Sequence, residues 1–333
     1  MSYANQYPAS FKNHIEKIAI VGASGQSGSY IVDALLKTGK HKVTAITRAD
    51  SNSKFPAGVE VKRVDYDDQS SLVEALQGQE ALIITMGIMA PQDQQTKLIE
   101  AAAAAKIAWI VPNEFGGDNA NESLLRDIPI NAVKAQYREH IEKLGVSSWI
   151  GICCNFWYDY SLSLGNFSID IKNRTATLWD DGNTRINTST LPQVGLGVAN
   201  LLNLKVLPDN EQDTSPCLAN YKNKFVYIAS FCLSQREMLA SVLRVTNATE
   251  EDWKIDYRPV EEVFKEGVEK FQKGDFRGML SGMYARNFFK DNAGNYGLTR
   301  GLDNEKLGLP KEDLDEFTKV AVEAVENGEV ANF

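Results

Sequence analysis

The sequence is poor in the residues that build metal sites and disulfides. Its 333 residues include four cysteines and three histidines. Cys153 and Cys154 are adjacent, Cys217 and Cys232 lie far along the chain, and no Cys-x-x-Cys spacing occurs. The histidines stand at unrelated positions, so the pattern indicates neither a His-rich metal site nor a Ser-His-Asp hydrolase. We therefore expect buried thiols and no bound metal.

Long apolar runs and an excess of positive charge are also lacking. No stretch approaches the roughly 20 apolar residues that cross a bilayer. The first 17 residues lack the basic segment and apolar run of a secretory signal. The formal net charge of −9 opposes a general attraction to nucleic acid or to an anionic membrane. We expect a cytoplasmic protein, monomeric or homodimeric, that binds neither nucleic acid nor membrane.

Apolar strands alternate with helix-compatible segments over the first half of the chain. Continuous apolar strands of this kind are typical of a parallel sheet covered by helices on both faces. The sequence therefore predicts an α/β fold, in which residues 1–155 form a Rossmann-type doubly wound parallel sheet. The strands are expected at 18–21, 43–47, 59–61, 81–85, 109–111 and 149–152.

The regular alternation fades beyond residue 156. A strand is expected at 225–228, a helix at 234–245, and an amphipathic helix at 311–325 that begins after Pro310. We assign residues 156–333 to a smaller C-terminal substrate-binding domain, some elements of which are free to return to the first sheet.

A glycine-rich loop follows the first expected strand and leads directly into a helical segment. In such a βαβ unit the first glycine permits a tight turn, the second lets the backbone approach a pyrophosphate, and the third lets helix and strand pack closely. The N-terminus of the helix adds unpaired N–H groups. We therefore predict a dinucleotide site made by Gly22, Ser24, Gly25, Gln26, Ser27 and Gly28.

The end of the second expected strand indicates which dinucleotide binds. NAD-binding units usually have an acidic residue here, whereas this strand ends in Thr47 and Arg48. An arginine suits the 2′-phosphate of NADP(H), and one charge-assisted contact favours NADP by about 10- to 100-fold. We predict NADP(H) as the cofactor, with Arg48 and Lys54 near its phosphate. Asp50 complicates this assignment because it is close to Arg48 in the sequence.

A second motif, Val111-Pro112-Asn113-Glu114-Phe115-Gly116-Gly117, precedes a helical segment that carries Lys134. With the glycine loop, these features resemble the isoflavone reductase-like and NmrA-like atypical short-chain dehydrogenases over roughly residues 17–160. The resemblance implies a fold that binds NADP(H) and a catalytic lysine at position 134. Asn113 stands where the family usually has serine.

Lys134 is the predicted catalytic residue. The Tyr-x-x-x-Lys pair of typical short-chain dehydrogenases is missing, because Ile141 stands four positions after Tyr137. Lys134 lies at the edge of an apolar helical stripe, so its stem can be buried while its amine points into a cleft. Desolvation then lowers the lysine pKa and makes it a usable general acid or base, typically worth about 10²–10⁴ in rate.

Residues at other strand ends are expected to border the cofactor or the substrate. Cofactor contacts are predicted for Lys134 and for Met86, Gly87, Ile88, Asn113, Asn155 and Phe156. The aromatic stretch after 149–152 can bracket a flat substrate, although ordinary packing between domains explains such a cluster equally well. The predicted substrate contacts are Glu114, Phe115, Trp157 and Tyr158.

The resemblance also implies a reaction. We expect an NADPH-dependent reductase of a small aromatic or conjugated carbonyl compound, phenylpropanoid- or isoflavone-like, with hydride transfer assisted by Lys134. Two alternatives stay open at this point: a non-catalytic regulator that senses NADP(H), and a non-redox biosynthetic enzyme on the same fold. The sequence names neither the substrate nor the bond that is reduced.

Overall fold

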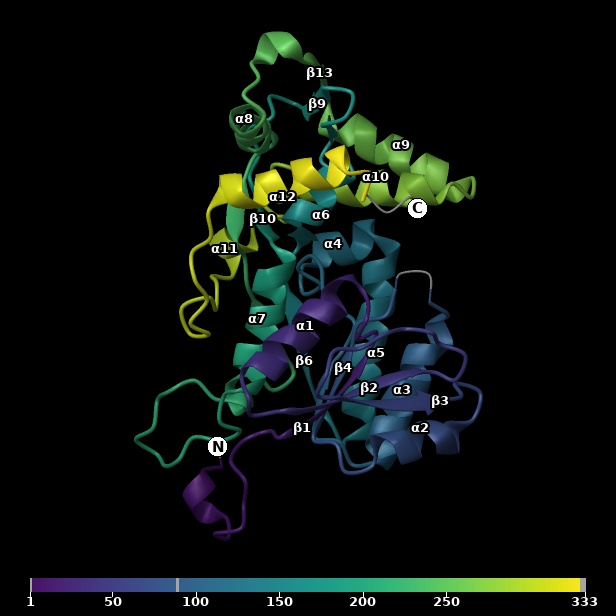
Figure 1. Ribbon diagram of the computed structural model, residues 1–333, viewed down its shortest axis with the longest axis vertical. Helices are drawn as coiled ribbons and strands as arrows, with labels where there is room; N and C mark the ends of the chain where they lie inside the picture. Colours follow the sequence, from purple (N-terminus) through teal and green to yellow (C-terminus); the bar gives the residue numbers. More distant parts are fainter. Residues whose placement is uncertain (1, 88–89, 330–333) are drawn as a thin grey trace.

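The computed structural model describes residues 2–87 and 90–329 (Figure 1). Within these residues, seven parallel strands form one large sheet in the order β11-β6-β5-β4-β1-β2-β3. This order, with β1 between β4 and β2, is the doubly wound arrangement, and the predicted Rossmann-type fold is confirmed. The strands are β1 (Lys17–Val21), β2 (Lys42–Arg48), β3 (Val59–Val64), β4 (Ala81–Ile84), β5 (Trp109–Val111), β6 (Ser148–Cys153) and β11 (Lys224–Tyr227).

Helices cover both faces of this sheet because its strands are apolar on both sides. On one face, Ile18 and Ile20 of β1 pack in a core with α1 (Gln26–Lys37) and α7 (Leu191–Leu202). On the other face, Ala19 and Val21 share a core with three further helices (Figure 1). Those helices are α2 (Gln69–Leu76), α3 (Gln92–Ala104) and α5 (Pro129–Leu144).

A second core lies above the carboxyl ends of the large sheet (Figure 1). Two small sheets frame it, one of β7 (Phe156–Trp157), β10 (Ile186–Ser189) and β12 (Phe231–Leu233), the other of β8 (Ile169–Asp170), β9 (Thr175–Trp179) and β13 (Lys254–Arg258). The helices of this upper part are α4 (Glu122–Asp127), α6 (Tyr158–Ser163), α8 (Gln235–Val245), α9 (Val260–Gln272), α10 (Phe276–Asn287), α11 (Tyr296–Thr299) and α12 (Leu314–Glu326). Short 3-10 helices stand at Ala4–Gln6, Leu218–Tyr221 and Glu250–Asp252.

The large sheet and its covering helices include elements from the second half of the chain. Both β11, which pairs with β6, and α7, which packs on α1, come from beyond residue 155. In the other direction, α4 precedes residue 155 and Leu124 of α4 packs against Ala293. The division into residues 1–155 and 156–333 therefore stays a prediction about domains, across which elements are exchanged in both directions.

The last helix begins later than the sequence indicates. The prediction placed its start directly after Pro310, but α12 begins at Leu314, where the Asp313 carboxylate accepts a hydrogen bond from the N–H of Glu316. The Glu312 carboxylate instead accepts a hydrogen bond of 3.0 Å from the Thr190 hydroxyl. This tertiary contact holds the segment before α12 away from helical geometry, and Asp313 then supplies the N-cap.

The cysteines are free thiols. Cys153, Cys154 and Cys217 are buried as predicted, and Cys232 is half-buried. Burial raises the pKa of Cys154 to about 12 and that of Cys153 well above its ordinary value, so both are held as thiols at neutral pH. Among the described helices, none has the length and apolar composition that a membrane crossing needs.

Candidate active site

The glycine loop between β1 and α1 is shaped by close contacts that only glycine allows. Gly22 has a φ of +80°, and a Cβ on it would lie 2.1 Å from the carbonyl oxygen of Thr85. A Cβ on Gly28 would lie 2.0 Å from the carbonyl oxygen of Gly22. The outer glycines are thus required by the turn and by helix–strand packing. A Cβ on Gly25 would meet only the Gly22 carbonyl oxygen, at 3.1 Å.

The first turn of α1 fits a phosphate group. Gly25 is the N-cap residue of α1 and no side chain caps the helix, so the first-turn N–H groups have no side-chain acceptor. Gly25, Gln26 and Ser27 all line one cavity. A helix N-terminus open to a cavity in this way has the donors and the dipole direction that a pyrophosphate needs.

The loop after β2 lies beside the glycine loop. The Ser24 and Ser53 hydroxyls are 3.0 Å apart. Arg48 is exposed and loosely paired with Asp50, at 3.7 Å, so its guanidinium is accessible to a ligand. Arg63 was missed by the sequence reasoning. Its guanidinium donates to the carbonyl oxygen of Ser51 at 2.6 Å and shapes this loop.

A cavity of about 370 Å³ connects the N-terminus of α1 to the carboxyl ends of β4, β5 and β6. Its volume falls within the range of small-molecule sites. Gly22, Ser24, Gly28, Arg48 and Lys54 are not part of its lining, and Ile88 lies outside the described residues. The predicted site residues on its wall are Gly25, Gln26, Ser27, Met86, Gly87, Asn113, Phe115, Lys134, Asn155, Phe156 and Trp157.

Lys134 of α5 is on this wall. Its Nζ lies 3.7 Å from the position that a Cβ on Gly116 would take. Among the described residues, no hydrogen bond or ion pair engages Nζ. Burial lowers the pKa of Lys134 below its ordinary 10.5, and the nearby Glu114 carboxylate only partly opposes this effect. A desolvated amine without a fixed partner gives up its proton more readily than an exposed lysine does, which suits a general acid or base.

Glu114 is not on the wall of this cavity, so its role as a substrate residue stays a prediction. Its side chain is 1% exposed and forms an ion pair with Arg138 and a hydrogen bond with Asn119. Arg138 in turn lies over the rings of Trp149 and Phe225. The buried carboxylate needs these partners, because a lone charge there would be strongly destabilising.

Tyr158 is also absent from the cavity wall, and its role as a substrate residue likewise stays a prediction. The side chain is fully buried in the upper core, and its hydroxyl is 2.7 Å from that of Thr318. The reason is that α6 begins at Tyr158, so residues three or four apart share a face. Trp157, Tyr160 and Ser161 share the face toward the cavity, whereas Tyr158 is turned away from it.

Asn113 has a structural contact of its own. The side-chain amide donates to the carbonyl oxygen of Met86 at 2.8 Å, which ties the end of β5 to the end of β4. The hydroxyl of Thr85, another cavity residue that the sequence reasoning missed, donates to the carbonyl oxygen of Val21 at 2.9 Å. Side chains therefore join the ends of β1, β4 and β5 under the cavity.

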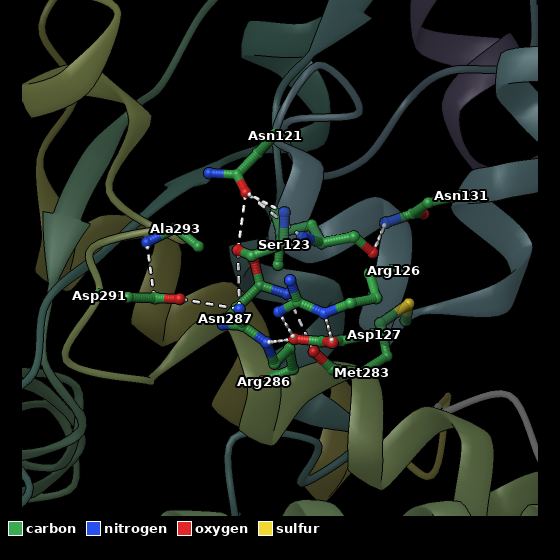
Figure 2. A network of polar contacts seen from close by, with 11 residues as sticks. Asn121, Ser123, Arg126, Asp127, Asn131, Met283, Arg286, Asn287, Asp291 and Ala293 are labelled. Atoms are coloured by element: carbon green, nitrogen blue, oxygen red, sulfur yellow. Dashed lines mark hydrogen bonds and ion pairs between the residues drawn. The ribbon is translucent and has the colours of Figure 1, made fainter.

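The far wall of the cavity was not predicted. It comes from α4, the start of α5 and α10, and no local motif marks it. Arg286 of α10 is 2% exposed and pairs with Asp127 of α4 and with Asp291, which joins α10 to α4 (Figure 2). The missed wall residues are Leu124, Ile128, Ile130, Asn131, Phe276, Leu280, Met283, Tyr284 and Asn287, with Tyr160, Ser161 and Asn166 beside them.

Comparison with known proteins agrees with this architecture. The model of the NmrA-like family matches residues 14–318. Oxidoreductase aprR of Aspergillus flavus is 30% identical over 307 residues, which cover 90% of this chain and 96% of the relative. Oxidoreductase poxI of Penicillium oxalicum is 28% identical over 90% of this chain and 92% of its own. The chain belongs to the NmrA-like family, as its motifs predicted.

Solved structures share the fold. An isoflavone reductase superposes with a TM-score of 0.69 at 21% identity, covering 91% of this chain and 98% of its own. A chain solved with NADP⁺ and (+)-pinoresinol gives 0.69 at 16% identity, covering 93% and 100%. An NADPH-dependent quinone oxidoreductase of Escherichia coli with NADPH gives 0.63 at 18% identity, covering 90% and 98%. The predicted cofactor, NADP(H), is the one bound in the last two structures.

Proposed function

We propose that the protein is an NADPH-dependent reductase of a small aromatic or conjugated carbonyl compound, phenylpropanoid- or isoflavone-like. The position of Lys134 carries the proposal. Its amine has a lowered pKa and lies on the wall of a cavity that begins at the N-terminus of α1. The reductase and oxidoreductase names of the relatives support the same reaction type.

In this proposal the chain holds the cofactor at two places. Gly25 and the first-turn N–H groups of α1 bind the pyrophosphate, while Arg48 and Lys54 approach the 2′-phosphate beside Ser24. When bound, NADPH supplies a hydride to an electrophilic carbon of the substrate. The nicotinamide end of the site is bordered by Met86, Gly87, Asn113, Asn155 and Phe156.

Lys134 handles the proton in this proposal. Its ammonium group donates a hydrogen bond to a substrate oxygen, stabilises negative charge there and transfers a proton directly or through water. Phe115 and Trp157 flank a flat substrate, and the apolar side chains of α10 exclude water from the reacting centre.

The cofactor assignment is tested by calorimetric titration with NADPH, NADP⁺ and NADH. We expect tight NADPH binding that weakens by roughly tenfold in Arg48→Ala, because a charge-assisted phosphate contact is lost. Lys42→Ala removes the same charge from the opposite end of β2 and serves as the control. If Arg48→Ala and Lys42→Ala bind NADPH equally well, the phosphate contact is assigned to the wrong residue.

Turnover is tested with a panel of aromatic enones, followed through the absorbance of NADPH. The proposal predicts that NADPH is consumed only when a substrate is present. Tight NADPH binding without consumption by any compound favours the non-catalytic sensor. Product formation with unchanged NADPH favours a non-redox reaction.

A further inference from the structure

Two amide side chains of the cavity wall have unused acceptor atoms. Asn155 follows β6 and Asn287 ends α10, and their side chains are 2% and 3% exposed. Among the described residues, neither Oδ1 atom has a hydrogen-bond partner. A buried carbonyl oxygen without a donor is uncommon in a folded protein and calls for a ligand or a bound water.

The orientation of both amides is fixed by their nitrogen atoms. Nδ2 of Asn155 donates to the carbonyl oxygen of Asn187 at 2.8 Å and to that of Gly294 at 3.4 Å. Nδ2 of Asn287 donates to the carbonyl oxygen of Met283 at 2.9 Å (Figure 2). A reversed amide would set oxygen against oxygen at each of these contacts. Both Oδ1 atoms are therefore the ones that remain without a partner.

The two oxygens lie close to one point beside Gly117 in the cavity wall. A Cβ on Gly117, which also lines the cavity, would lie 3.7 Å from Oδ1 of Asn155 and 3.6 Å from Oδ1 of Asn287. The adjacent Gly116 faces Nζ of Lys134. The paired oxygens thus stand next to the part of the cavity where we place the reaction.

The backbone around the pair is firmly held. The N–H of Asn155 donates to the carbonyl oxygen of Gly116 at 2.7 Å. Arg286, which precedes Asn287, is fixed between Asp127 and Asp291 (Figure 2). Acceptors that cannot turn away to find other partners discriminate between ligands with and without a donor.

We infer that Asn155 and Asn287 form a paired acceptor beside Gly117 that receives an N–H or O–H group of the bound ligands, which makes Asn287 a specificity-determining residue. The inference rests on the proposed function, because it places the cofactor and the substrate in this cavity. Two groups have the required chemistry, the carboxamide of the nicotinamide and a hydroxyl on the aromatic substrate. A ligand with neither group leaves both oxygens unpaired and binds more weakly.

The test compares ligands with and without a donor in two arms, both read by calorimetry. The cofactor arm uses NADPH and its 3-acetylpyridine analogue, which lacks the carboxamide N–H. The substrate arm uses hydroxychalcones and their methyl ethers on the NADP⁺ complex. The variants are Asn287→Leu, which removes one acceptor, and Gly117→Ala, whose methyl group would occupy the point near both oxygens at ordinary contact distances. Asn166→Leu removes another amide of the cavity wall and is the matched control.

We expect the native protein to prefer the donor ligand by roughly 10- to 100-fold in one arm. Both Asn287→Leu and Gly117→Ala should abolish that preference, and Asn166→Leu should keep it. The arm that responds tells whether the carboxamide or the hydroxyl is the donor. The inference is overturned if neither arm shows a preference that these variants remove. Because the readout is binding, this result is distinct from a failure of turnover, which bears on the proposed function alone.

Discussion

The glycine-loop side of the cavity is made mostly of backbone, whereas the opposite wall is made of side chains. On the first side, the uncapped first turn of α1 reaches the cavity through Gly25, Gln26 and Ser27, which form a single short stretch. On the second side, the Asp127–Arg286 pair joins residues that are 159 positions apart in the sequence. In the proposed function, the cofactor side is thus built from local sequence, and the wall assigned to the substrate is built from long-range packing.

The largest effect on the glycine-loop side of the cavity is expected from a methyl group at Gly22. Gly22→Ala requires a left-handed backbone and a contact of 2.1 Å with Thr85. We expect a loss of about 2–4 kcal/mol in the free energy of unfolding. We also expect NADPH to bind at least about 100-fold more weakly, because the displaced loop loses its phosphate contacts. Denaturant titration and calorimetry measure the two effects.

The matched control is Gly25→Ala, in which the new methyl group lies in the cavity and its nearest contact is 3.1 Å away. This variant should unfold within about 1 kcal/mol of the native protein and bind NADPH about tenfold more weakly. Equal losses of stability in Gly22→Ala and Gly25→Ala would contradict the conclusion that Gly22 is required for packing whereas Gly25 faces the ligand.

The wall made of side chains is tested by replacing Arg286. Replacing it with methionine leaves Asp127 and Asp291 without their buried partner, and we expect a loss of about 2–3 kcal/mol in the free energy of unfolding. The KM for the substrate should rise while the Kd for NADPH is unchanged. Arg126→Met is the control, since Arg126 pairs with the same Asp127 but is 72% exposed. It should cost under about 1 kcal/mol; a larger loss there than at Arg286 would refute the role of Arg286.

A smaller effect is expected in the pH dependence of stability. Since the pKa of Lys134 in the folded protein is below 10.5, the unfolded chain binds this proton more tightly. The free energy of unfolding therefore rises with pH between the lowered pKa and 10.5, and Lys134→Met lacks this contribution. At neutral pH the variant should be the more stable protein. Urea titrations of both proteins across pH check this, and parallel curves would show that Lys134 is not desolvated.

The large sheet could be predicted because its strands carry their signal locally. Most of them are apolar runs bounded by turn residues, and the glycine loop follows β1 directly. The start of α12 was predicted too early because a tertiary bond of Glu312 with Thr190 decides it. The pairing of β11 with β6 and the packing of α7 on the sheet likewise depend on contacts between distant segments, which periodicity does not reveal.

The predicted site residues that lie on the cavity wall come from the side of the site where motifs exist. Tyr158 is not on the cavity wall, because helical spacing separates it from Trp157 and Tyr160 within the aromatic stretch after β6. Glu114 is held away from the cavity wall by Arg138, which lies one helical turn beyond Lys134. Asn287 and the rest of α10 carry no chemical motif, so nothing local could assign them to the cavity.

The most direct test of the account is the rate of NADPH consumption by Lys134→Met, measured with an enone that the native protein reduces, beside a calorimetric titration with NADPH. Methionine keeps the length of the stem and removes the amine. We predict that kcat falls by about 10²–10⁴ while the Kd for NADPH stays within a factor of about three, because only proton transfer and charge stabilisation are lost. Undiminished turnover in the variant would contradict the central role of Lys134.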